Sequence, residues 1–355
     1  MSKRTCVHII IRDKFTDGYI RFLKENDMGW NHVFCTFKGN YPLSFSDVLV
    51  FDNYSKILSS QQDLLQRCER IVIAAFFDEA LALLKMPKAL WQKTYIQFWG
   101  GDIYRFRNPR QGLLARTKQL IVYNLVRMCI KRCCGVLTLV EKDYDSLESI
   151  FKLKNLDHRL VQVPDDFYEI NHLDYQRIVN EHPYCGKKRI LIGNSATIEN
   201  QHLAIFELLS RKKIDEIEVV VPLSYGDEEY REQVLSAGKR LLGTSFVPIL
   251  DFMAREDYIG LLASCDTAIF NNDRQQATGN IIIMANLGKK LYLRDDTTMW
   301  SFFAELGFVL HKVKDLAEED ISTVMTYAAA DVAANHEALL RMEGEAIEQW
   351  RAFLL

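Results

Sequence analysis

The chain has 355 residues, which is more than one hydrophobic core usually serves, so we expect two domains. Hydrophobic residues make up 48% and charged residues 26%, with only 17 Gly and 7 Pro, which excludes a disordered, collagen-like or coiled-coil chain. The net charge of -3 gives no overall attraction to nucleic acid, and we expect no nucleic-acid partner.

The eight cysteines are scattered and form no CxxC pair, so the sequence predicts neither a zinc site nor a disulfide framework but reduced thiols in a cytosol. The first apolar stretch, residues 6–11, is too short for a signal peptide. No run approaches the roughly 18 apolar residues of a membrane-spanning helix. Any contact with a membrane is therefore expected to be peripheral.

Short β-type runs alternate with helical stretches, which is the pattern of βαβ units and a parallel sheet. In the first half the pattern predicts a helix over 18–26 and strands at 7–11, 33–37, 48–51, 70–77, 94–99 and 135–140. In the second half it predicts strands at 189–193, 217–223, 245–250, 267–270 and 290–293, with helices over 198–210, 228–242, 257–263 and 279–287. The tail, 315–355, is nearly free of Gly and Pro and is predicted to be helical.

These elements predict an α/β protein with two doubly wound domains that face a cleft. A weakly periodic segment with Pro164, Pro183 and Gly186 marks the linker. The expected domains are 1–170 and 189–335, joined by a linker at 171–188, and a last helix, 336–355, can pack back on the first domain. In such sheets, ligands bind beyond the carboxyl ends of the strands.

The two domains differ in the loops that follow their first strands. After 7–11 the loop reads RDKFTDG and lacks the GxGxxG of a dinucleotide site. After 189–193 the small residues Gly193, Asn194 and Ser195 lead into a segment with Asn200 and His202. Such a turn at a helix start suits a phosphate, although its polar side chains would equally serve as a helix cap and His202 as a packed histidine.

A second polar loop precedes the apolar helix near residue 280. It contains Arg274, Gln275, Gln276 and Thr278, and Arg274 can place a fixed charge opposite phosphate oxygens. The alternative is a surface turn in which Thr278 is the N-cap. Two loops of this kind in one domain favour a nucleotide diphosphate as the ligand.

In the first domain, the strand at 94–99 ends at Trp99 and is followed by Gly100, Gly101 and Asp102. A carboxylate at this position can take a proton from an acceptor hydroxyl as general base. The alternatives are that Asp102 caps the next helix and that Trp99 is a core residue.

Between Ile103 and Val140 the chain has eight Lys and Arg residues and no acidic residue. On a helix, Arg116, Arg127 and Lys131 fall on one side, opposite an apolar side with Leu114 and Ile121. This pattern indicates a surface for anionic lipid or for a lipid-linked diphosphate, and the alternative is a solvated basic face over a packed apolar one. The expected membrane-facing residues are Arg105, Arg107, Arg116, Arg127, Lys131 and Arg132.

Four blocks in order, WGGDIY (99–104), LIGNSATIENQH (191–202), VVPLSYGDEEYREQV (220–234) and DRQQATGN (273–280), resemble glycosyltransferase family 56. Members of that family add 4-acetamido-4,6-dideoxygalactose from its dTDP derivative to a polyprenyl-linked intermediate of enterobacterial common antigen. The resemblance spans roughly residues 95–305, and RDKFTDG and residues 277–280 depart from it. It implies a GT-B fold of two Rossmann-like domains, with the donor held mostly by the second one.

Carried over by position, the resemblance implies a donor site and an acceptor side. The donor site would comprise Gly193, Asn194, Ser195, Asn200, His202, Pro222, Tyr225, Gly226, Arg274, Gln275, Gln276 and Thr278. Trp99, Gly100, Gly101 and the catalytic Asp102 would belong to the acceptor side.

The expected partners are a dTDP-sugar, a polyprenyl-diphosphate-linked saccharide and an anionic membrane surface, at the inner face of the cell membrane. No DxD pair follows a strand, so we expect no metal, and no cofactor. The alternatives are a nucleotide-sugar 2-epimerase and a non-enzymatic two-domain ligand-binding protein.

Overall fold

The computed structural model describes residues 3–13, 15–26, 28–108, 112–162, 175–214 and 216–355. The chain divides into unit 1, which comprises Met1–Tyr168 and Glu343–Leu355, and unit 2, Glu169–Met342. The expected domain boundary at residue 170 and the start of the expected linker lie outside the described residues. The remainder of that linker contains helix α8 (Tyr175–Glu181) and the first residue of strand β8.

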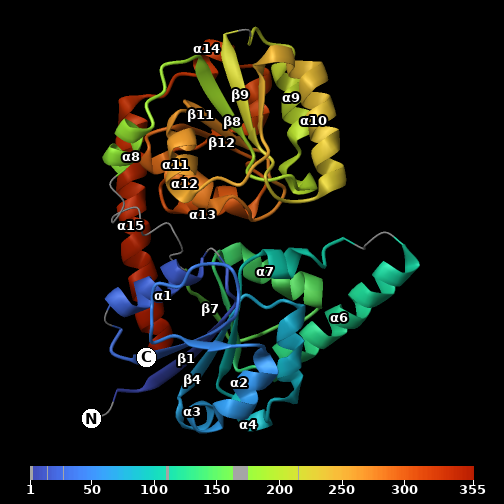
Figure 1. The fold of residues 1–355 in the computed structure, drawn as a ribbon, viewed down its shortest axis with the longest axis vertical. Helices are drawn as coiled ribbons and strands as arrows, with labels where there is room; N and C mark the ends of the chain where they lie inside the picture. Colours follow the sequence, from blue (N-terminus) through green and yellow to red (C-terminus); the bar gives the residue numbers. More distant parts are fainter. Residues whose placement is uncertain (1–2, 14, 27, 109–111, 163–174, 215) are drawn as a thin grey trace. The chain divides into compact units, whose positions relative to one another are not determined.

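Unit 1 contains a parallel sheet of seven strands in the order β3-β2-β1-β4-β5-β6-β7 (Figure 1). The strands are β1 (Thr5–Ile10), β2 (Asn31–Phe37), β3 (Leu49–Phe51), β4 (Arg70–Ala74), β5 (Thr94–Phe98), β6 (Gly135–Thr138) and β7 (His158–Leu160). The first six match the predicted runs, whereas β7 was missed because its three residues form no apolar run. The strand order reverses between β1 and β4, so the loops after these two strands flank the topological switch point.

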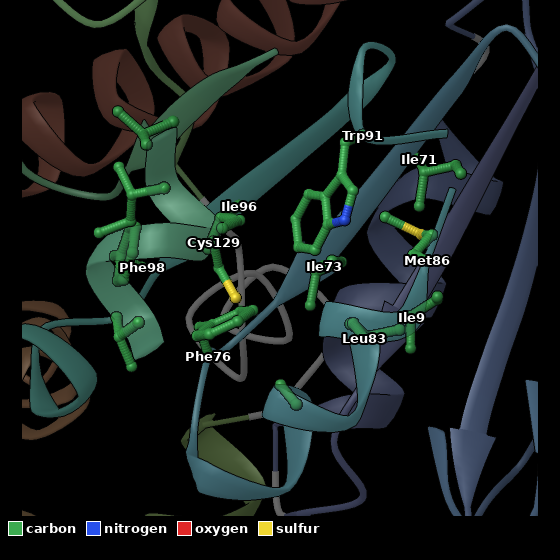
Figure 2. Packing of buried hydrophobic residues seen from close by; sticks show 14 of the residues in the cluster. Ile9, Ile71, Ile73, Phe76, Leu83, Met86, Trp91, Ile96, Phe98 and Cys129 are labelled. Atoms are coloured by element: carbon green, nitrogen blue, oxygen red, sulfur yellow. The ribbon is translucent and has the colours of Figure 1, made fainter. Parts of the chain in front are cut away.

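Helices cover both faces of this sheet. They are α1 (Thr16–Glu25), α2 (Tyr54–Ser60), α3 (Gln62–Arg67), the 3-10 helix η1 (Asp78–Lys85), α4 (Lys88–Trp91), α5 (Gly101–Tyr104), α6 (Leu113–Arg132) and α7 (Glu141–Phe151). Successive residues of a strand point to opposite faces. Val7 and Ile9 of β1 therefore enter one core, which contains Trp91 and Phe98 (Figure 2).

The second face of the unit 1 sheet packs against α1 and the end of the last helix, α15 (Ala329–Leu354). Cys6 and Ile10 of β1 lie in this core with Tyr19 and Trp350. The indole N–H of Trp350 donates to the Gln162 carbonyl at 2.9 Å. The last turns of the chain are therefore part of the unit 1 core.

Unit 2 contains a second parallel sheet, of six strands in the order β10-β9-β8-β11-β12-β13. The strands are β8 (Lys188–Ile192), β9 (Ile217–Pro222), β10 (Phe246–Ile249), β11 (Thr267–Phe270), β12 (Lys290–Leu293) and β13 (His311–Lys312). Its order reverses between β8 and β11, whose following loops are the two that the sequence singles out for phosphate.

The helices of unit 2 lie on both faces of its sheet, with α9 and α10 on one and α11 and α12 on the other (Figure 1). Besides α8 they are η3 (Ile198–Asn200), α9 (His202–Leu209), α10 (Glu228–Leu242), η4 (Gly243–Ser245), α11 (Arg255–Ala263), α12 (Thr278–Asn286), α13 (Thr298–Glu305), η5 (Val313–Ala317), α14 (Ile321–Val324) and the first part of α15. The tail predicted as one helical stretch is thus broken into η5, α14 and α15. The predicted α/β fold with two Rossmann-like units is confirmed.

Candidate functional site

The loop after β8 begins with a glycine that no other residue can replace without displacement of its neighbours. Gly193 has φ +66°, and a Cβ at this position would lie 2.6 Å from Asn200 Oδ1 and 2.7 Å from His202 Nε2. The absence of a side chain therefore lets Asn200 and His202 approach the backbone at the end of β8. Sequence analysis placed all three residues in the donor site, and the structure brings them together.

Asn200 connects the two loops at the switch point of unit 2. Its Oδ1 accepts from the Asn194 backbone N–H at 3.1 Å and from Asn272 Nδ2 at 3.1 Å. Its Nδ2 donates to Thr197 Oγ1 at 2.8 Å and is 3.3 Å from Ser195 Oγ. Asn200 is fully buried, so these bonds replace water that the amide has lost.

The loop after β9 is joined to the loop after β8 by backbone contacts. Ala196 N–H donates to the Tyr225 carbonyl at 2.8 Å, and Asp227 N–H donates to the Ala196 carbonyl at 2.7 Å. Gly226, with φ +125°, is required here because a Cβ would lie 2.3 Å from the Ala196 carbonyl oxygen. Pro222 is buried as the last residue of β9.

Three amide side chains around this network share one property. Asn194 donates its Nδ2 to Tyr225 Oη at 3.0 Å, Asn272 donates to Asn200, and Gln276 Nε2 donates to Ser195 Oγ and Thr197 Oγ1, each at 3.0 Å. The carbonyl oxygens of Asn194, Asn272 and Gln276 are buried, and none has a hydrogen-bond partner among the residues that the structure describes. Buried amide oxygens without donors are uncommon in folded proteins and fit a ligand site.

The helices that begin at these loops have no side-chain cap from the described residues. The residue before α9 is Gln201, with φ +48°, and the residue before α12 is Ala277, with φ +61°. The alternative in which Thr278 is the N-cap of α12 is therefore wrong, because Thr278 is the first helical residue. Its hydroxyl lies 3.4 Å from Gln275 Nε2. First-turn N–H groups and the helix dipole favour an anion at such an end.

Arg274 contacts two groups of its own unit. Its Nε lies 3.3 Å from Glu199 Oε1, and its Nη1 donates to the Gln275 carbonyl at 3.0 Å. Both side chains of this ion pair are partly exposed, so the pair can exchange partners when an anion competes for the guanidinium.

His202 is fully buried, and burial lowers its pKa to about 4. Its Nδ1 lies 3.3 Å from Tyr230 Oη, and no described residue bonds its Nε2. His202 is therefore neutral near pH 7 and can interact as a dipole, not as a cation.

In unit 1, Asp102 has a different environment from the one that a general base needs. The carboxylate is fully buried. Oδ1 accepts from the Trp99 backbone N–H and Oδ2 from that of Phe76, each at 2.9 Å. Burial raises the pKa of Asp102 to about 6 despite these two bonds. This geometry favours a positioning role, in which Asp102 joins the loops after β4 and β5.

Arg105, expected to face a membrane, instead completes this connection. It donates to Asp78 Oδ1 at 2.6 Å and to the backbone carbonyls of Asp102 and Phe76. Ala75, the residue before Phe76, has φ +62°, a backbone conformation that costs energy for a residue with a Cβ. Asp102 and Arg105 therefore hold a strained turn at the switch point of unit 1.

Around this turn, Trp99 is half-buried and its ring meets Phe15 edge-on, with the ring centroids 5.9 Å apart. Gly100 has φ +88°, and no atom lies within 4 Å of where a Gly101 Cβ would be. The backbone at Gly101 is thus open to an approaching group.

Helix α6 buries one face and exposes part of the apolar side that the sequence pattern predicts. The face toward the core contains Val126, Cys129 and Ile130, whereas Leu114 and Ile121 are exposed, so the alternative of a packed apolar side is wrong for these two residues. Of the six expected membrane-facing residues, Arg107, Arg116, Lys131 and Arg132 are exposed. Arg127 donates to the Phe151 carbonyl at 2.7 Å and Arg132 to the Leu84 carbonyl at 3.3 Å, so these two, with Arg105, make internal contacts.

Sequence analysis missed several residues of the two sites. Asn272 and Glu199 lie in the loops that it examined, but only the fold shows that they contact Asn200 and Arg274. Asp143, in the first turn of α7, is also buried and accepts from Tyr104 Oη at 2.6 Å. The only signal for Asp143 is its place shortly after a predicted strand.

Comparison with solved structures supports the fold. A glycosyltransferase from Rickettsia africae ESF-5 has a TM-score of 0.66 at 14% identity, covering 100% of this chain and 99% of its own. The UDP-forming trehalose-phosphate synthase from Burkholderia xenovorans has a TM-score of 0.66 at 11% identity, covering 100% and 98%. The structure "trehalose-6-phosphate from E. coli bound with UDP-2-fluoro glucose" has a TM-score of 0.66 at 9% identity, covering 99% and 98%. At these identities the likeness concerns the GT-B fold alone.

The sequence itself gives the family. Residues 56–354 match the family model described as 4-alpha-L-fucosyltransferase, glycosyl transferase group 56. This range includes all four blocks on which the resemblance depends, the polar loops of unit 2 and the buried Asp102. The chain therefore belongs to glycosyltransferase group 56 and is a glycosyltransferase with the GT-B fold.

Proposed function

We propose that this glycosyltransferase moves an N-acetylated deoxyamino sugar from a dTDP-sugar to a polyprenyl-diphosphate-linked saccharide in the synthesis of a bacterial surface polysaccharide. The observation that carries the proposal is the pair of polar loops at the switch point of unit 2, joined by Asn200 and lined by three amide oxygens without donors. In open α/β sheets this is the place where nucleotide ligands bind.

The diphosphate of the donor would bind at the start of α12. The first-turn N–H groups, without a side-chain cap from the described residues, offer donors and a positive dipole. Arg274 lies in the loop before this helix and would exchange Glu199 for phosphate oxygens. As the sugar is transferred, the same groups would stabilise the negative charge that develops on the departing dTDP.

The sugar of the donor would meet the amide oxygens. The carbonyl oxygens of Asn194, Asn272 and Gln276 have no donor among the described residues, so they can accept hydrogen bonds from a ligand. Sugar hydroxyls and an acetamido N–H are donors of this kind. The family name refers to fucose, and the proposed sugar shares the 6-deoxygalactose skeleton.

The acceptor would be bound by unit 1, near the half-buried Trp99 and the open backbone at Gly101. We propose that Asp102 keeps this loop and the strained turn at Ala75 in place, because its buried carboxylate accepts two backbone N–H groups. A proton carrier for the acceptor hydroxyl needs access that Asp102 lacks here.

A lipid-linked acceptor requires that the enzyme reach a membrane surface, and α6 has the properties for this contact. No helix in the described part of the chain is long and apolar enough to cross a membrane. The first turns of α6 expose Leu113 by 83% and Leu114 by 88%, with Leu120 and Ile121 about half-exposed on the same side. This end of the helix projects beyond the sheet of unit 1 (Figure 1).

Basic residues flank the exposed apolar face of α6. Arg116 and Lys118 are exposed beside the four apolar side chains, and the helix sequence contains no acidic residue. An interfacial helix combines an apolar face with basic flanks in this way, since Lys and Arg can reach head groups while leucines enter the acyl boundary. We propose that α6 lies in an anionic membrane surface.

The transfer reaction is tested with radiolabelled dTDP- and UDP-sugars, with and without polyprenyl diphosphate saccharides. We expect label to move to the lipid-linked acceptor from the dTDP-sugar only. Acceptor-independent conversion of the donor would indicate an epimerase, and binding without turnover would indicate a ligand-binding protein.

Membrane contact is tested by co-sedimentation with anionic vesicles. Leu114→Glu removes an apolar contact of up to about 2 kcal/mol and adds repulsion of about 1 kcal/mol, so binding should weaken between about 10-fold and 100-fold. Leu340→Glu is the matched control, because Leu340 is also an exposed helical leucine, in α15. Equal vesicle binding by both variants would contradict the assignment of α6.

A further inference from the structure

Three side chains with metal-binding atoms meet on one face of the unit 1 sheet. Cys6 and His8 are two residues apart on β1, so both point to the same face. His32 of β2 is the register partner of Cys6 and therefore points to that face as well. The Cys6 thiol and one nitrogen from each histidine lie within 4.8 Å of one another. Sequence analysis predicted no metal site, because these ligands come from two strands.

The hydrogen bonds of the histidines define which atoms face one another. His8 Nε2 lies 2.8 Å from His32 Nδ1, and His8 Nδ1 lies 2.7 Å from Tyr19 Oη. When the His8 proton is on Nδ1 and is donated to Tyr19 Oη, His8 Nε2 carries a lone pair that can bind a metal ion. A hydrogen bond from the second ring nitrogen to a fixed partner is how metal-binding histidines are oriented in proteins.

We propose that Cys6, His8 and His32 bind a single Cu(I) ion through Sγ, Nε2 and Nδ1. Two nitrogens bound to one metal at about 2.0 Å lie about 3.3–3.5 Å apart, so the rings must separate by only about 0.6 Å. On binding, the S–H proton of Cys6 is released to solvent as the S–Cu bond forms, and the His32 proton moves from Nδ1 to Nε2 by exchange with water. No oxidation state changes.

Charge and coordination number favour Cu(I) over Zn(II). One thiolate and one Cu(I) ion are together neutral, whereas Zn(II) would leave a net positive charge in a core that includes Tyr19 and Trp350. A closed structural zinc site also has four protein ligands, and the described residues provide three. Thiolate and imidazole are ligands that a soft ion such as Cu(I) accepts.

The ion can reach the site from solvent through His32. The proposed copper site is also independent of the proposed transfer reaction. Cys6 and His8 are fully buried, but His32 is only partly buried and lies at the start of β2. The donor loops belong to unit 2, so failure of the copper site and failure of sugar transfer are separate results.

The test is an anaerobic titration of the full chain with Cu(I) against a chromogenic Cu(I) chelator. The exposed thiols Cys134 and Cys185 are first replaced by Ser, since they can bind soft metals on their own. We expect one Cu(I) per chain, and affinity about 100-fold lower in Cys6→Ser and in His32→Gln. Cys35→Ser is the matched control, because this buried thiol on β2 faces the opposite core.

Two further measurements make the result decisive. X-ray absorption of the bound copper should show one sulfur and two nitrogen neighbours, and Cu(I) should raise the thermal midpoint of the parent but not of His32→Gln. Unchanged Cu(I) affinity in His32→Gln, a shell of sulfur neighbours only, or tighter binding of Zn(II) than of Cu(I) would overturn the proposal.

Discussion

Asn200 provides the sharpest test of the donor site, because it joins the loops after β8 and β11. Asn200→Ala removes hydrogen bonds at 3.1, 3.1 and 2.8 Å and leaves the Asn194 N–H and Asn272 Nδ2 buried without an acceptor. At about 1 kcal/mol for each bond, this change should destabilise the loop network by about 3 kcal/mol. We expect faster hydrogen exchange in the two loops and dTDP binding that is at least about 10-fold weaker.

Asn200→Asp separates the effect of charge from that of structure. The substitution keeps the Oδ1 acceptor, and the Ser195 and Thr197 hydroxyls can turn to donate to the new oxygen. It adds a negative charge to the site. For a phosphate charge roughly 8 Å away and an effective dielectric constant of about 20, the repulsion is about 2 kcal/mol, or about 30-fold in affinity. Exchange in the loops should change less than in Asn200→Ala.

The control for both variants is a second fully buried asparagine of unit 2. Asn335 of α15 accepts from the Val309 N–H at 2.7 Å and donates to Tyr327 Oη at 2.7 Å. Val309 precedes β13, so this contact lies at the edge of the sheet opposite to the polar loops. Asn335→Ala should lower the thermal midpoint without changing dTDP affinity in calorimetric titration. If Asn335→Ala and Asn200→Ala weaken dTDP binding equally, the assignment of the donor loops is refuted.

Three further substitutions test other steps of the reasoning. Gly226→Ala places a Cβ 2.3 Å from the Ala196 carbonyl oxygen and should abolish dTDP binding in the same titration. Gly243→Ala, also at positive φ but with open space, should lower stability and leave dTDP affinity unchanged. Arg274→Ala should weaken dTDP binding about 10-fold and reduce its dependence on salt. Because burial raises the Asp102 pKa to about 6, its contribution to stability is complete below about pH 4 and is lost, by roughly 3 kcal/mol, as pH rises through 6. In Asp102→Asn, the fall of the thermal midpoint between pH 4 and pH 7 should therefore become smaller. If the midpoint falls as steeply as in the unsubstituted protein, the burial argument is contradicted.

The sequence was sufficient to predict where the two polar loops of unit 2 begin, because that position depends on local pattern. The apolar runs that become β8 and β11 end at Ile192 and Phe270, and polar residues follow at once. Parallel strands present their carboxyl ends at one edge of the sheet, so the two loops had to lie on the same side. The short strands β7 and β13 were missed because two or three residues contain no period to detect.

Roles that depend on partners were harder to predict. An aspartate after a strand is read as a catalytic base because such residues face ligands, but the Asp102 carboxylate points inward to the Phe76 and Trp99 N–H groups. The sequence left the orientation of α6 open, since periodicity identifies an apolar side but not which side meets a core. Leu114 and Ile121 have the same hydrophobicity whether they face protein or solvent.

The Cys6, His8 and His32 cluster shows why register matters more than spacing for such sites. Sequence patterns for metals rely on ligands close together in one segment, such as CxxC. Here 24 residues separate the two histidines that face one another, and a shift of β2 by one residue would turn His32 to the other face. The register is fixed by burial of Phe34 on this face and Cys35 on the opposite one. The same burial that stabilises the sheet therefore assembles the three ligands.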